Sequence, residues 1–166
     1  MAAWYDDIFQ ELSRRYQLDG AMEAHDSIIP NRILANFGTG EGCWDRVQRT
    51  IGALATSGGF RARTVVVDGY PFPAADVEMF RKFRQFAVEM GLEVWLSASM
   101  DAREGTVGGV GVPPALAPYA DECAVVIVLL DRGTYIHLGV AKDRGQAVSE
   151  CRLRLDPHFL LLAEED

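Results

Sequence analysis

Residues 64–68, TVVVD, form the segment around which the predicted fold is built. β-Branched residues favour extended backbone. A run of them with almost no polar interruption is typical of a strand that is buried on both faces, as in a parallel sheet. We therefore expect this strand to lie inside a parallel sheet and to end at the carboxyl edge of that sheet with Asp68.

Helix and strand patterns alternate on either side of this strand. Apolar residues at helical spacing predict helices, whereas apolar runs bounded by glycine and proline predict strands. The predicted elements are, in order, helix 3–16, strand 32–37, helix 43–56, strand 64–68, helix 74–90 and strand 92–98. Such an alternation favours right-handed crossovers, with helices on both faces of a largely parallel sheet.

The C-terminal part of the chain has a different pattern. Residues 99–121 are rich in glycine and proline and predict a long loop, which is the best candidate for a contact surface. Apolar and alternating runs within residues 123–156 predict strands joined as antiparallel hairpins. The segment around His25 and Asp26 is predicted to be a connection. We expect one α/β domain over residues 1–166.

Composition excludes several classes of protein. The net charge of −8 argues against binding nucleic acid, because phosphate backbones are bound by clustered lysine and arginine. The sequence predicts neither a membrane span nor a signal peptide. Its three cysteines show no CxxC spacing, which favours a reducing cytoplasm, and its histidines show no metal-ligand spacing. We expect a cytoplasmic protein with no metal site.

A glycine-rich segment follows the predicted strand 32–37 and precedes the helix at Cys43. Strand, glycine loop and helix in this order can cradle an anion on backbone amides. The candidate residues of such an anion loop are Gly38, Thr39, Gly40 and Gly42. The segment contains no lysine, and Glu41 would repel phosphate. A tight connection is therefore the alternative interpretation.

Two polar residues follow predicted parallel strands and are further candidates. Ligands bind open α/β sheets beyond the carboxyl ends of their strands. Asp68 follows the valine run, and Ser97 lies at the end of strand 92–98. A carboxylate at this edge can hold Mg²⁺ or its waters. The alternative interpretation is that Asp68 caps the turn that it begins.

The order of these segments resembles the core of the RecA-like P-loop ATPases over residues 32–156. The resemblance rests on an apolar strand ending in DGYPF, on SAS at 97–99 and on GVAKDRG at 139–145. It implies a three-layer sandwich in which Asp68 is the metal-associated aspartate and Ser97 lies near a polar sensor position. It also implies that Lys142 and Arg144 reach a nucleotide in a neighbouring subunit, with ATP and Mg²⁺ as cofactors.

The sequence departs from this family at the phosphate loop. A P-loop ATPase needs G-x-x-x-x-G-K-[ST], and no such segment occurs in these 166 residues. We therefore expect no ATPase activity and predict an interaction or regulatory module that binds a protein partner or associates with itself. Two alternatives remain open at this point. The chain is a nucleotide-binding α/β protein of another kind, or its phosphate loop lies outside these residues.

Overall fold

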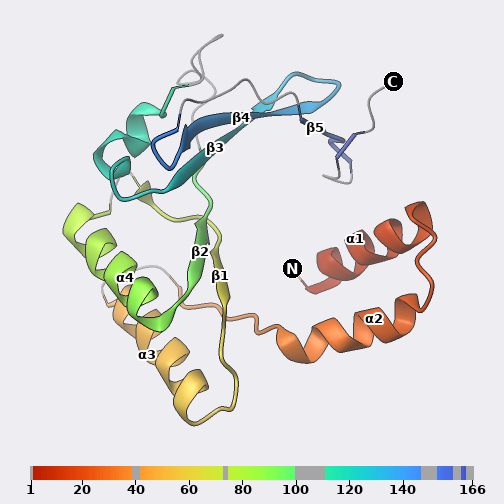
Figure 1. The fold of residues 1–166 in the computed structure, drawn as a ribbon, viewed down its shortest axis with the longest axis horizontal. Helices are drawn as coiled ribbons and strands as arrows, with labels where there is room; N and C mark the ends of the chain where they lie inside the picture. Colours follow the sequence, from red (N-terminus) through yellow and green to blue (C-terminus); the bar gives the residue numbers. More distant parts are fainter. Residues whose placement is uncertain are drawn as a thin grey trace.

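A computed structural model describes residues 2–38, 42–72, 75–99, 111–146, 153–158 and 162–163 (Figure 1). Its elements form three groups. Two N-terminal helices pack on each other, two helices accompany a small parallel sheet, and a separate antiparallel sheet follows in the C-terminal part. The predicted anion loop lies partly outside the described residues, as do residues 100–110 of the predicted long loop.

The N-terminal group consists of α1 (Ala2–Arg15), α2 (Ala21–Ile28) and the short 3-10 helix η1 (Ile29–Asn31). Helix α2 occupies the segment predicted to be a connection. His25 of α2 turns back to α1, where its Nε2 lies 3.3 Å from Oδ1 of Asp6 and its ring lies 5.1 Å from that of Phe9. These contacts hold α2 against α1.

The central group contains a parallel sheet of two strands. Helix α3 (Cys43–Thr56) leads to β1 (Thr64–Val67), and α4 (Val77–Met90) leads to β2 (Glu93–Leu96). The strands are in register from the Thr64–Glu93 pair to the Val67–Leu96 pair. The Asp76 carboxylate caps α4 by accepting from the Glu78 N–H at 2.9 Å, and Gly91 ends the helix at a φ of +66°.

An aromatic core joins the helices to the segment that follows β1. Tyr70 and Phe72 come from that segment, Phe80 from α4, and Tyr119 from the 3-10 helix η3 (Pro114–Tyr119); all four are buried. Their rings contact one another in tilted or edge-to-face arrangements, with centroids 4.5 to 6.0 Å apart. Trp44 of α3 packs against the same cluster, with its ring tilted relative to that of Tyr70.

The C-terminal strands form an antiparallel sheet of their own. Strand β3 (Val125–Asp131) pairs with β4 (Ile136–Asp143), which pairs with the short β5 (Arg154–Leu155). Strands β3 and β4 form an antiparallel hairpin, as expected for this part of the chain. A register shift between Val126 and Ile127 marks a bulge in β3.

The predicted fold class, a largely parallel RecA-like three-layer sandwich with helices on both faces, is wrong. Residues 32–37 belong to no strand, so among the described residues only β1 and β2 pair in parallel. Strand β3 pairs with its hairpin neighbour β4 instead of extending the parallel sheet. The structure therefore holds two small sheets in place of one large sheet.

The burial predicted for TVVVD is also wrong. Figure 1 shows α3 and α4 on one side of β1 and β2, with α1 and α2 standing apart on the other side. Because the N-terminal helices do not cover the sheet, Val66 of β1 keeps 68% of its surface exposed.

Among the helices of the described residues, none has the length and apolar character that crossing a membrane requires.

Candidate functional site

The carboxyl edge of the parallel sheet brings together two of the predicted site residues. Ser97 Oγ donates to Oδ1 of Asp68 at 2.6 Å and accepts from the Gly69 N–H at 2.8 Å. The backbone continues this connection, because the Ser97 N–H donates to the Val67 carbonyl at 2.9 Å. The prediction that Asp68 and Ser97 lie at one sheet edge agrees with this geometry.

These contacts make the Asp68–Ser97 pair a clasp between the ends of β1 and β2. Ser97 engages one carboxylate oxygen, and both side chains are exposed. A metal site needs several ligands, and no group of three or more histidine, cysteine or acidic side chains in the described part of the chain is placed to hold an ion. The clasp closes the turn at Asp68 through Ser97 Oγ, which accepts from the Gly69 N–H, whereas the capping interpretation expects the Asp68 carboxylate to accept from the turn backbone.

The described ends of the glycine segment have the backbone of a tight turn. Gly38 and Gly42 have φ values of +63° and +71°, which favour glycine. The Gly38 N–H donates to Oδ1 of Asn36 at 3.0 Å, and Gly42 precedes α3. The candidates Thr39 and Gly40 lie outside the described residues.

A surface hollow of about 580 Å³ lies beside this segment. It is lined by Arg46 and Arg49 together with Phe37 and further residues of α3. Arg46 Nη2 donates to the Phe37 carbonyl at 3.3 Å and so ties α3 to the preceding segment. Guanidinium groups are suited to anions.

Lys142 lies on β4 of the antiparallel sheet, and Arg144 directly follows that strand. Lys142 Nζ donates to the Ala120 carbonyl and is half-buried. Arg144 follows β4 with a φ of +44°, and its backbone N–H donates to the Ala124 carbonyl at 2.7 Å. Both residues bind the segment that precedes β3, and no hydrogen bond between described residues joins either of them to Asp68 or Ser97.

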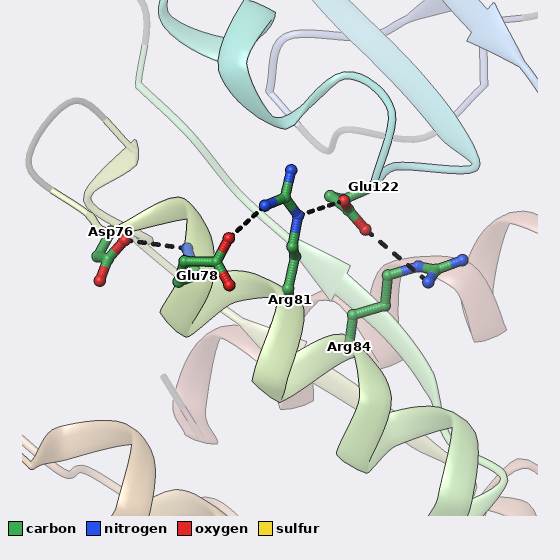
Figure 2. Close-up of polar contacts among 5 residues, drawn as sticks. All are labelled: Asp76, Glu78, Arg81, Arg84 and Glu122. Atoms are coloured by element: carbon green, nitrogen blue, oxygen red, sulfur yellow. Dashed lines mark hydrogen bonds and ion pairs between the residues drawn. The ribbon is translucent and has the colours of Figure 1, made fainter.

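A polar network between α4 and the turn before β3 was not predicted from sequence (Figure 2). Arg81 Nε donates to Oε1 of Glu122 at 2.7 Å, and Arg84 Nη1 lies 3.8 Å from Oε2 of the same carboxylate. Arg81 also pairs with Glu78. The hydrogen bonds that Arg81 donates to Glu122 and then to Glu78 raise the pKa of its guanidinium.

The sequence pattern placed Arg81 and Arg84 on a solvated helix face. Their side chains are indeed about half exposed, whereas that of Glu122 is 16% exposed. The sequence signal that could have indicated this network was the spacing of three residues between the two arginines, which places both on one face of α4. Their shared acidic partner lies about forty residues away and is brought close by tertiary structure.

Two buried tyrosine hydroxyls have different surroundings. The Tyr119 hydroxyl lies 2.8 Å from the Phe72 carbonyl oxygen and 2.6 Å from that of Ala75. The Tyr70 hydroxyl is buried without a hydrogen-bond partner among the described residues. Burial first, then the nearby Tyr119 and Asp76, raise the pKa of Tyr70 to about 12.

Cys123 is the half-buried thiol at the rim of this core. Burial raises the pKa of its thiol, and the nearby Lys142 ammonium opposes this shift in part. A raised pKa leaves little thiolate near neutral pH, so Cys123 is a poor nucleophile. The side chain therefore acts as a packing residue beside the aromatic core.

Comparison of the chain with protein-family models, with curated proteins and with solved structures finds no match.

Proposed function

We propose that this chain is a non-catalytic relative of the RecA-like ATPases and acts in the cytoplasm as a protein-interaction module. Its partner is another protein or a second copy of the chain, and neither nucleic acid nor membrane is involved. The observation that carries the proposal is the set of large apolar side chains that the described residues leave exposed.

Several large apolar side chains of the described residues are exposed, among them Met22 at 78%, Val66 and Val88 at 68%, Leu129 at 55% and Trp95 at 46%. Large exposed apolar areas of soluble proteins serve as contact surfaces, which supports an interaction module.

The missing phosphate loop and the contacts of Lys142 and Asp68 support a non-catalytic role. The chain has no phosphate loop to hold the β- and γ-phosphates of ATP. Lys142 donates its ammonium to a backbone carbonyl, and Asp68 is engaged by Ser97. These groups are used to join segments of the fold.

ATP turnover by the purified chain tests this proposal. With Mg²⁺ present, we expect phosphate release no faster than in the protein-free blank. Asp68→Ala is the control, since contaminating activity survives this substitution. Turnover that Asp68→Ala abolishes would falsify the non-catalytic role.

A second candidate function is a P-loop ATPase whose phosphate loop lies outside these residues. The observation that favours it is the sheet topology. In the described part of the chain, β2 pairs only with β1, and β3 pairs only with β4, so β2 and β3 each have one unpaired edge. A strand supplied from elsewhere would join the two sheets. An in-frame G-x-x-x-x-G-K-[ST] in the coding sequence directly upstream would support this candidate over the first.

A further inference from the structure

The outward face of the parallel sheet carries an uncovered apolar pair. Val66 of β1 and Trp95 of β2 are register partners, so their side chains lie next to each other on one face. They keep 68% and 46% of their surface exposed, whereas the alternate residues of both strands are partly buried. This pair forms the apolar centre of what we call the open face.

Polar side chains stand at the four corners of the open face. Thr64 and Glu93 are register partners at the start of the strands, and Asp68 and Ser97 are joined by their hydrogen bond at the end. Along β1 the hydroxyl of Thr64 comes first and the carboxylate of Asp68 last. Along β2 the carboxylate of Glu93 comes first and the hydroxyl of Ser97 last. The two carboxylates therefore occupy one diagonal and the two hydroxyls occupy the other.

This arrangement is complementary to itself. A two-fold axis in the plane of contact, directed along the strands or across them, places each corner against a corner of the other diagonal. Each carboxylate of one copy then faces a hydroxyl of the second copy, and no carboxylate faces another. With the axis along the strands, Val66 packs against Trp95 of the second copy.

We propose that the open face is the interface of a two-fold symmetric homodimer. The inference rests on the proposed function, and it names the contact surface and the partner. An apolar centre with a polar rim is the usual anatomy of a protein interface.

Val66→Lys and Val88→Lys form a matched pair of variants for testing the dimer. Both valines are 68% exposed, but Val88 lies on α4 and not on the open face. We expect light scattering to give wild type and Val88→Lys a mass near twice 18.3 kDa at micromolar concentration. Val66→Lys buries two ammonium groups in the contact and raises the dimer Kd roughly a hundredfold, which leaves a monomer.

Tryptophan fluorescence gives a second measurement that needs no disruptive variant. On dilution of the wild-type chain, Trp95 returns to water and the emission moves to longer wavelength. Trp95→Phe should lack this concentration-dependent shift. This measurement decides the question if circular dichroism shows that Val66→Lys does not fold.

The outcomes for the dimer and for the proposed function are separate. A wild-type mass of 18.3 kDa at every concentration, or a Val66→Lys dimer as tight as wild type, overturns the homodimer. A monomer without ATP turnover overturns the homodimer alone, since an interaction module can bind a different protein. ATP turnover that Asp68→Ala abolishes overturns the proposed function whatever the mass.

Discussion

Arg81 donates from Nε to Oε1 of Glu122 at 2.7 Å and thereby joins α4 to the turn that precedes β3. The two residues belong to the central and the C-terminal groups of the fold. The Glu122 carboxylate also lies near Arg84, so it is held between two guanidinium groups. This carboxylate is an anchor between α4 and the antiparallel sheet.

Replacing Glu122 should weaken that anchor. Glu122→Gln removes the charge that both arginines contact, and we expect the melting temperature to fall by roughly 2 °C. Because salt screens exposed charges, the difference from wild type should shrink in about 1 M NaCl. Lys82→Ala, at the exposed cation beside Arg81, is the control and should leave the melting temperature unchanged. An equal loss in both variants would contradict the anchor.

The two buried tyrosine hydroxyls predict opposite effects of the same substitution. Tyr119→Phe removes a hydroxyl that contacts two backbone carbonyls and should lower the free energy of unfolding by about 1–2 kcal/mol. Tyr70→Phe removes a buried hydroxyl without a described partner and should be neutral or slightly stabilising. Urea unfolding of both variants measures the difference. A greater loss in Tyr70→Phe would show that its hydroxyl has a partner.

Tyr70 also predicts how stability depends on alkaline pH. Its folded-state pKa of about 12 is above the ordinary value of 10.0, because burial disfavours the phenolate. The stabilisation from the neutral form is therefore complete below pH 10 and is lost as the pH rises from 10 to 12. Unfolding free energies across this range should fall less steeply in Tyr70→Phe than in wild type. Identical slopes would contradict the raised pKa.

Lys142 predicts a change in the reactivity of Cys123. Lys142→Met removes the ammonium that partly lowers the pKa of the thiol, so the pKa should rise further. Alkylation of Cys123 by iodoacetamide at fixed pH should then slow, as mass spectrometry can follow residue by residue. Cys43 in the same sample is the internal control. Faster alkylation of both thiols would instead indicate a general opening of the fold.

Gly42 of the candidate anion loop and Gly52 of α3 should respond oppositely to alanine. Gly42 has a φ of +71°, which strains any side chain, so Gly42→Ala should cost about 1–2 kcal/mol in the free energy of unfolding. Gly52 lies within α3, where an added Cβ meets no atom within 4 Å. Gly52→Ala should therefore stabilise by about 0.5–1 kcal/mol. A stabilising Gly42→Ala would contradict the left-handed turn.

Most of the individual elements could be predicted from sequence. The apolar spacing over 3–16 and 74–90 marked α1 and α4, and the apolar runs at 64–68 and 92–98 marked β1 and β2. The prediction failed at residues 32–37, where an apolar run suited a strand but no neighbouring edge pairs with it. It also missed α2, whose short amphipathic pattern around His25 depends on contacts with α1.

The candidate site was predictable only where it depended on strand ends. Asp68 and Ser97 lie together because parallel strands end at the same edge of a sheet. The positions of Lys142 and Arg144 relative to them were not predictable from the resemblance, since Lys142 lies on β4 of the other sheet and Arg144 directly follows it. Glu122 was missed because its partners are far away in the chain.

Local sequence therefore specified helices, strands and hairpins, since periodicity, glycine stops and turn residues act over a few neighbouring positions. The pairing of strands and the covering of faces depended on tertiary contacts. Val66 illustrates the difference: its β-branched side chain and its neighbours specify a strand, but they do not specify whether a helix covers it. Segments far apart in the sequence pair with strand edges and cover apolar faces. In this chain, no segment among the described residues covers the open face on β1 and β2.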